Sequence, residues 1–214
     1  MDRTPYTIAR LEDAEMQARA EAFADELDGR RTVRTFAPDP VPVEVISAIV
    51  RAASTAPSGA HRQPWHFVAV SDPATKSQIR AAAEAEEREN YERRFPEAWL
   101  RALEPFDTNA DKPYLEVAPW LVAVFAQTRG TEGKNYYVTE SVGIAVGMLL
   151  AAVHRAGLVA VTHTPSPMRF LQEVLARPAG ERAFLLLAIG HPAPGVTVPD
   201  LQRKALDDVL TVIG

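Results

Sequence analysis

The sequence predicts one α+β domain of three layers, with helices on the faces of a central sheet. Segments with apolar residues at helical spacing are interleaved with a few short runs rich in β-branched and aromatic residues. At 214 residues, with 47% hydrophobic and 24% charged residues, the chain is long enough to bury one substantial core. No internal repeat or low-complexity linker divides it. We therefore expect a single domain over residues 1–214.

The first predicted helix is amphipathic and ends at Gly29, a residue favoured just after helices. A later helix, opened by Pro73, has a second half almost free of large apolar residues, so it cannot be mostly core. The most apolar helix carries Gly143, Gly147 and Ala151 on one face, which allows another helix to approach closely. The predicted helices are residues 8–28 (inner face Leu11, Ala14, Ala18, Ala22 and Leu27), 43–53, 74–94, 97–103, 135–156 and about 168–175.

Four runs of β-branched, aromatic and other apolar residues are predicted to be strands. They are residues 65–70, 118–127, 158–162 and 183–189. Residues 196–214 form a C-terminal extension that is partly extended.

Composition excludes several classes of function. The chain has no cysteine, so disulfides, thiolate metal sites and thiol chemistry are excluded, and redox chemistry would need a cofactor. Its five histidines show no metal-ligand spacing, and no Gly-x-Gly-x-x-Gly or Gly-Lys-Ser/Thr loop indicates a dinucleotide or P-loop site. A formal net charge of −5 argues against nucleic-acid binding.

Hydropathy indicates a cytoplasmic protein that does not bind membranes. The first ten residues are of mixed polarity and do not resemble a secretory signal. The longest apolar run, residues 142–153, is too short to span a bilayer.

A basic cluster follows the first helix. Arg30, Arg31, Thr32 and Arg34 place three guanidinium groups and a hydroxyl within five residues of an acidic chain. Guanidinium groups are planar donor forks that suit a phosphate, so the cluster indicates a bound anion. The alternative is a solvated run of charge at a helix end.

A second stretch, residues 56–65, precedes the first predicted strand. Pro57, Ser58 and Gly59 hold it in a defined non-helical course, so its backbone amides could face a flat ligand.

The polar helical region carries three groups of complementary chemistry. Glu87 and Tyr91 are four residues apart and share a helical face, and Lys112 follows an irregular stretch. A carboxylate, a phenol and an ammonium match an amino-acid zwitterion, with Lys112 for the carboxylate and Glu87 for the ammonium. The alternative is a solvated helix face and a loop lysine.

These motifs together resemble one known family. Arg-Arg-Thr-Val-Arg at residues 30–34 and Ala-Pro-Ser-Gly-Ala-His-x-x-Pro-Trp at residues 56–65 resemble the flavin-binding segments of the nitroreductase superfamily. Glu87-x-x-x-Tyr91, Thr108-Asn109 and Lys112-Pro113-Tyr114-Leu115 resemble the active-site lid of its iodotyrosine deiodinase branch. The likeness extends from about residue 28 to the C-terminus.

The resemblance implies a nitroreductase-like fold with a central mixed or antiparallel sheet, a homodimer, and FMN as cofactor. It implies an N-terminal helical segment over about residues 1–28 and a lid over about residues 84–115. It also implies that Thr164 bonds the flavin N5 and that the amide of Ala60 receives the substrate phenolate, while Glu87, Tyr91 and Lys112 clamp its zwitterion. The cofactor residues implied are Arg30, Arg31, Thr32, Arg34 and Arg203 at the phosphate, and Pro57, Ser58, Gly59, Thr162, His163 and Thr164 at the flavin, with no metal.

Two of these assignments have plain structural alternatives. Without the resemblance, Thr164 would be a strand-end threonine and Arg203 a surface arginine. His163 stands where animal members of the family have a threonine.

The resemblance implies reductive dehalogenation of halotyrosines, with electrons from NAD(P)H through an external reductase. Two alternatives remain at this point: a general FMN-dependent nitro- or quinone reductase, and a flavin-dependent halotyrosine sensor that does not turn over.

Overall fold

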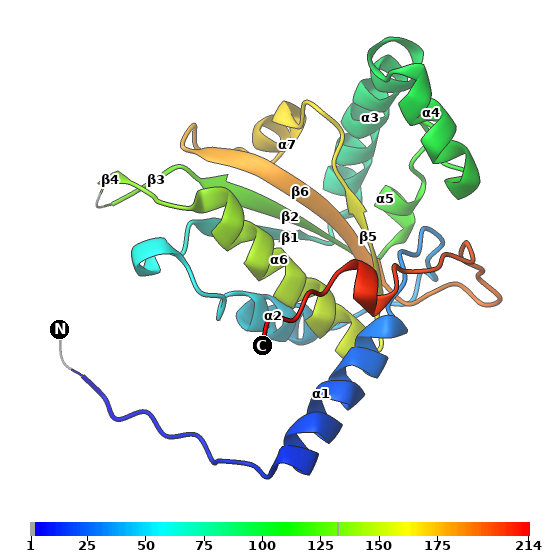
Figure 1. Cartoon of the computed structure of the whole chain (residues 1–214). Helices are drawn as coiled ribbons and strands as arrows, with labels where there is room; N and C mark the ends of the chain where they lie inside the picture. Colours follow the sequence, from blue (N-terminus) through cyan, green and yellow to red (C-terminus); the bar gives the residue numbers. More distant parts are fainter. Residues whose placement is uncertain (1–2, 132) are drawn as a thin grey trace.

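The computed structural model describes residues 3–131 and 133–214 and contains a four-stranded antiparallel sheet at its centre (Figure 1). The strand order is β1-β2-β6-β5. The strands are β1 (Trp65–Val70), β2 (Trp120–Gln127), β5 (Val159–His163) and β6 (Glu181–Gly190), and a small hairpin is made by β3 (Arg129–Gly130) and β4 (Gly133–Lys134).

The sheet is the middle of three layers because its inner strands are apolar on both faces. Along β2, Val122 and Val124 join the core beneath one set of helices, while Leu121 and Phe125 join the core on the other face. Helices α2 (Val43–Ala53) and α6 (Val138–Arg155) cover the first face. Helices α3 (Pro73–Glu89), α5 (Tyr114–Val117) and α7 (Arg169–Val174) cover the second. The predicted α+β fold of three layers is confirmed.

The predicted polar helix is interrupted near its end. Asp72 caps the start of α3 by accepting a 2.7 Å hydrogen bond from the amide of Thr75. A π-helical turn, Asn90–Arg94, follows α3, and the chain then folds back through α4 (Glu97–Leu103) beside it (Figure 1). A 3-10 turn, Glu104–Phe106, and an irregular loop lead to α5.

The basic cluster lies at the β5 edge of the sheet. Thr32 forms a parallel bridge with Ala160 of β5, and the amide of Val33 donates a 3.2 Å hydrogen bond to the Ala160 carbonyl. This parallel pairing at the edge of an antiparallel sheet makes it mixed, as the resemblance implied.

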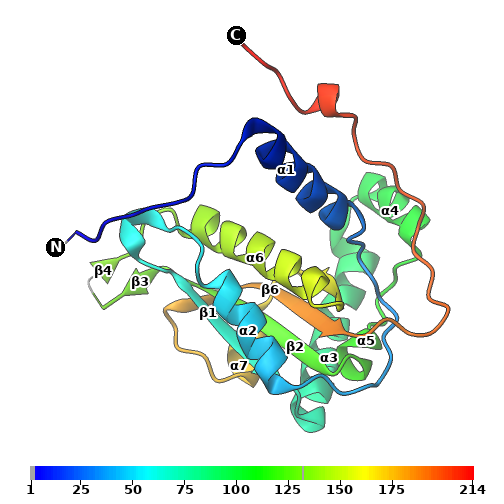
Figure 2. The same cartoon turned by 90° about the horizontal axis from the view of Figure 1, so that it is seen from below.

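Helix α1 differs from the prediction. It begins at Asp13 and ends at Asp28, and none of its residues is buried, so the predicted inner face is not covered within one chain. It projects from the body of the molecule (Figures 1 and 2). Its anchorage is at its C-terminal end, where His154 of α6 donates a 2.7 Å hydrogen bond to the carbonyl of Glu26. Residues 1 and 2 of the predicted N-terminal segment lie outside the described residues.

Helix α6 is slightly shorter than the predicted helix over residues 135–156, but longer than the apolar run of residues 142–153. Its 18 residues and mean hydropathy of 1.3 give it the length and composition of a membrane-spanning helix, although it packs as a core helix. Val142, Ala145, Leu149 and Val153 are buried in the core that α6 shares with α2 and the sheet. Its opposite face, with Gly143 and Gly147, is open, because a Cβ added at either glycine would have no neighbour within 4 Å.

Candidate functional site

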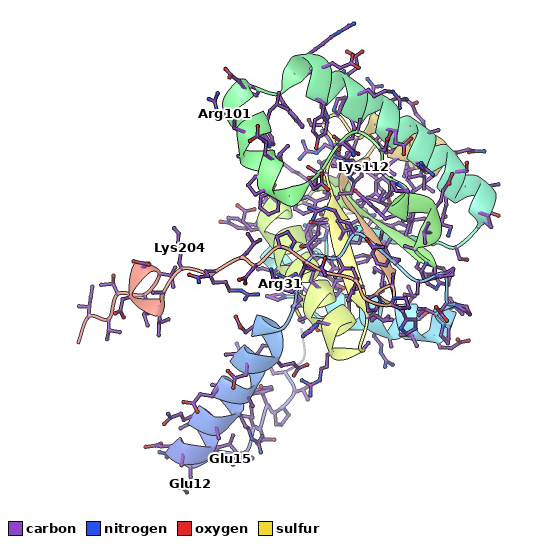
Figure 3. The ribbon with its side chains drawn as sticks, turned by 90° about the vertical axis from the view of Figure 1, so that its right-hand side faces the viewer. Glu12, Glu15, Arg31, Arg101, Lys112 and Lys204 are labelled. Carbon is purple, nitrogen blue, oxygen red and sulfur yellow. The ribbon has the colours of Figure 1, made fainter. Side chains whose placement is uncertain are left out.

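The basic cluster lines a cavity of about 300 Å³ next to the C-terminal extension. The guanidinium of Arg31 donates to the carbonyl of Pro199, and Arg203 donates 3.1 Å to the carbonyl of Arg30 and 2.6 Å to Asp28. Figure 3 shows Arg31 beside the segment that leads to the C-terminus. The lining residues are Arg30, Arg31, Thr32, Arg34, Phe106, Val198, Pro199, Leu201, Gln202 and Arg203. Four guanidinium groups and a hydroxyl around one cavity are suited to an anion such as phosphate.

A second cavity, of about 330 Å³, continues from the first and shares Arg30 and Thr32 with it. Its lining is mostly apolar and includes the small residues Gly147 and Ala151 of α6. The other lining residues are Leu27, Leu150, Ala160 and Thr162. The two cavities together offer a cationic end and an apolar shelf, formed by Gly147, Leu150, Ala151 and Ala160.

The turn at residues 57–63 is held in an unusual backbone conformation. Ala60, His61 and Gln63 have positive φ angles of 51°, 53° and 46°, a region that few residues other than glycine adopt. The amide of Gln63 donates 2.9 Å to the hydroxyl of Ser58. A Cβ at Gly59 would lie 2.7 Å from the ring of Tyr137, so only glycine fits there.

One chain does not bring the two predicted flavin segments together. Gly59 packs on Tyr137, the cap that precedes α6, whereas a Cβ added at Gly29 would lie 3.6 Å from His154 Nε2, near the other end of that helix. The helix between them has 18 residues and, at 1.5 Å per residue, spans roughly 27 Å. Pro57, Ser58 and Ala60 are therefore remote from the arginines of their own chain.

The three predicted substrate groups do come together in the region of α3, α4 and the following loop. Lys112 lies inward of the lid helices (Figure 3), with its Nζ 5.4 Å from the centre of the Tyr91 ring. Its ammonium donates to the carbonyl of Asn109, and the hydroxyls of Tyr91 and Thr108 are 2.8 Å apart. Glu87 and Lys112 are only 7% and 6% exposed. The alternative of a solvated helix face and a free loop lysine is wrong for these two residues.

Burial disfavours the charged forms of Glu87 and Lys112. It raises the pKa of Glu87, against the opposing effect of the Lys112 ammonium. It lowers the pKa of Lys112, and the positive charge of Arg34 acts in the same direction while Glu87 opposes it. A ligand with an ammonium and a carboxylate would supply the missing counter-charges.

The last predicted residues lie along β5 and just beyond it. Thr162 and Thr164 are exposed and alternate with His163, which is buried. Because successive side chains of a strand face opposite ways, Thr162 lines the second cavity and His163 points to the other side of the sheet. The structure therefore does not bring the side chain of His163 to the shelf, where the resemblance placed a flavin contact.

Sequence reasoning missed the surroundings of His163. Its Nδ1 is 3.1 Å from the hydroxyl of Tyr114 and 3.8 Å from a carboxylate oxygen of Glu87. The tyrosine was part of a recognised motif, but nothing in its spacing indicated that it meets a residue of β5.

Comparisons with known proteins identify the family of this chain. Residues 27–191 match the model of the nitroreductase family. An iodotyrosine deiodinase from Haliscomenobacter hydrossis is 55% identical over 97% of this chain and 96% of its own. Human iodotyrosine deiodinase 1 is 42% identical over 100% of this chain and 76% of its own. The chain belongs to the iodotyrosine deiodinase branch of the nitroreductase family.

Solved structures of the family share the fold. An iodotyrosine deiodinase bound to FMN and 3-iodo-L-tyrosine superimposes with a TM-score of 0.77 at 31% identity, covering 89% of this chain and all of that one. An FMN-dependent nitroreductase from Mycobacterium smegmatis superimposes with a TM-score of 0.69 at 20% identity, covering 92% of this chain and all of that one. The second likeness concerns the fold alone.

The mutual dependence of Glu87 and Lys112 can be measured by unfolding in urea without ligand. Glu87→Gln and Lys112→Met should each lower the free energy of unfolding, because each leaves the other charged group buried without its neighbouring opposite charge. The double variant should lose about 1 to 3 kcal/mol less than the sum of the two single losses. Additivity within about 0.5 kcal/mol would contradict the coupling.

Proposed function

We propose that the chain is an FMN-dependent enzyme that removes halogen reductively from halotyrosines. The observation that carries the proposal is the convergence of Glu87, Tyr91 and Lys112 beneath the lid, beside the cavities of the basic cluster. Arg34 links the two regions, since it lines both the anion cavity and a cavity of about 370 Å³ formed by the lid loop. The solved relative that holds FMN and 3-iodo-L-tyrosine supports the same assignment.

The residues of the cluster fit FMN. Arg30, Arg31, Arg34 and Arg203, together with the Thr32 hydroxyl, would hold its phosphate. The shelf along Gly147 and Ala151 offers room for a planar ring, and the exposed Thr162 and Thr164 would supply hydroxyls near its edge. When bound in its reduced form, FMN would supply two electrons, which together with a proton from the medium replace the carbon–halogen bond by a carbon–hydrogen bond and release halide.

The working unit we propose is a homodimer with two-fold symmetry. The turn at residues 57–60 and the basic cluster lie at opposite ends of α6, so a second copy docked on the open face of α6 would place its turn at the first copy's arginines. The same docking would cover Gly143 and Gly147, and it would give α1 a surface to pack on. Each site would then contain residues of both copies.

The lid residues would hold and orient the substrate. Lys112 would bind the carboxylate and Glu87 the ammonium, with Tyr91 bridging, while the Ala60 amide brought by the second copy would receive the phenolate oxygen. Closing the lid over this arrangement excludes water, which strengthens each of these polar contacts. We propose NAD(P)H, through a separate reductase, as the source of electrons.

The substrate clamp, formed by Glu87, Tyr91 and Lys112, favours a halotyrosine dehalogenase over a general nitro- or quinone reductase. Such an enzyme has no need for a buried carboxylate and ammonium near its flavin, and a ligand that carries both counter-charges would offset the cost of burying Glu87 and Lys112 in their charged forms. A sensor without turnover would share the clamp, and only measured turnover separates it from an enzyme.

The phosphate assignment can be tested by cofactor content. Wild-type protein should retain about one FMN per chain, because each chain has its own arginine cluster. Replacing Arg30, Arg31 and Arg34 together by alanine should abolish retention. A matched triple variant at the exposed Arg51, Arg169 and Arg182 should keep its FMN. Full FMN content in the first variant would refute the phosphate assignment.

The clamp can be tested by comparing a halotyrosine with a halophenol that lacks the amino-acid group. Glu87→Gln and Lys112→Ala should weaken halotyrosine binding roughly thirtyfold or more, because loss of a buried charged partner costs about 2 to 5 kcal/mol. Halophenol should bind weakly to wild type and be nearly indifferent to both substitutions. Equal binding of the two ligands by wild type would favour the general reductase instead.

A further inference from the structure

A buried polar cluster lies beneath the substrate clamp. It brings together His163 at the end of β5, Glu87 of α3 and Tyr114 of α5. These side chains are 4%, 7% and 7% exposed. The His163 Nδ1 faces two oxygens, the Tyr114 hydroxyl at 3.1 Å and a Glu87 carboxylate oxygen at 3.8 Å.

The imidazole of His163 is uncharged at neutral pH. Burial, and then the positive charge of Lys112, lower its pKa to about 3. Burial likewise raises the pKa of Tyr114, so the phenol keeps its proton. The close approach of His163 to Glu87 is therefore not an ion pair, and any attraction between them depends on which ring nitrogen carries the hydrogen.

The surroundings favour hydrogen on Nδ1. The Nε2 atom is buried and has no hydrogen-bond partner, so a proton there would be a buried donor without an acceptor. A proton on Nδ1 can be donated to the phenol oxygen at 3.1 Å, and the negative charge of the Glu87 carboxylate, 3.8 Å away, favours that proton electrostatically.

The charge state of Glu87 depends on the groups around it. The charged and titratable groups around it are Lys112 of the lid loop, Tyr114 and His163. The positive charge of Arg34 in turn lowers the pKa values of Lys112 and Tyr114. The ammonium of Lys112 donates to the carbonyl of Asn109, so Glu87 shares this cation with a backbone acceptor. His163 is therefore placed to help keep the buried carboxylate of Glu87 ionised.

We propose that His163 is the positioning residue for Glu87: a hydrogen on its Nδ1, which lies 3.1 Å from the Tyr114 hydroxyl and 3.8 Å from the carboxylate, favours the ionised form of Glu87, so that Glu87 presents a negative charge to the ammonium of the substrate. The proposal rests on the proposed function, because it assigns Glu87 to that ammonium. It also gives the histidine a role on the lid side of the sheet, away from the cavity that Thr162 lines.

The test is the pH dependence of iodotyrosine binding by the FMN-loaded protein. His163→Leu removes the donor, so the pKa of Glu87 rises further and the loss of binding on acidification begins at a higher pH. We expect binding at pH 7 to weaken roughly tenfold or more, because a protonated Glu87 offers no negative charge to the substrate ammonium, and the loss of one member of a buried charge pair costs at least this much. Binding should recover as the pH rises toward 9. His163→Asn, whose amide nitrogen occupies the place of Nδ1, should restore affinity to within about threefold.

Two controls isolate the route through Glu87. In the Glu87→Gln background, which has no carboxylate to titrate, His163→Leu should change iodotyrosine affinity less than about twofold. Binding of iodophenol, which has no ammonium, should be unaffected by His163→Leu. An equal loss for both ligands, or an unchanged pH profile, would overturn the proposal.

The ring nitrogen that carries the hydrogen can be observed directly in the wild-type protein. Nitrogen-15 NMR of labelled histidine should show His163 as a neutral ring protonated at Nδ1 from pH 8 to pH 5. Protonation at Nε2 instead would overturn the proposal even if every variant failed to fold. If wild type binds no iodotyrosine at all, the proposed function fails, whereas normal binding with an unshifted His163→Leu profile removes only the positioning role.

Discussion

The hydrogen bond between the amide of Val33 and the carbonyl of Ala160 positions the arginine cluster relative to β5, on which the rest of the site depends. It joins the segment after α1 to the edge of the sheet and so sets the arginine cluster beside β5. Because side chains alternate along β5, one short strand then presents Thr162 to the cavity beside the arginines and His163 to the lid. The proposed cofactor residues and the proposed substrate residues are thus positioned by the same strand.

Much of the fold could be predicted because its elements are determined locally. The bounds of α2, β1 and α4 agree with the sequence pattern, and β2 was recognisable because a strand buried on both faces must be apolar throughout. The start of α1 could not be predicted in this way. Its apolar residues have helical spacing but nothing in one chain to pack against, so periodicity overestimated both its length and its burial.

The site was predictable where its residues are neighbours in sequence, and less so where they meet through tertiary contacts. Glu87 and Tyr91 share a helical face, and their meeting with Lys112 followed the family motif. The contact of His163 with Tyr114 and Glu87 joins three elements, and no local pattern indicated it. The separation of Gly59 from the arginine cluster could not be predicted, because it depends on tertiary packing: Gly59 lies at one end of α6, and Gly29, which precedes the arginines, lies at the other.

The central claim is that a zwitterion held beneath the lid is dehalogenated by electrons delivered at the site beside the arginines. It is tested most directly by release of halide under anaerobic conditions, after the FMN-loaded protein has been reduced chemically and mixed with iodo-, bromo- or chlorotyrosine. The account predicts stoichiometric halide and tyrosine from at least one of these, and none from the matched halophenol at the same concentration. Binding of halotyrosine without halide release would contradict the account and leave a sensor in its place.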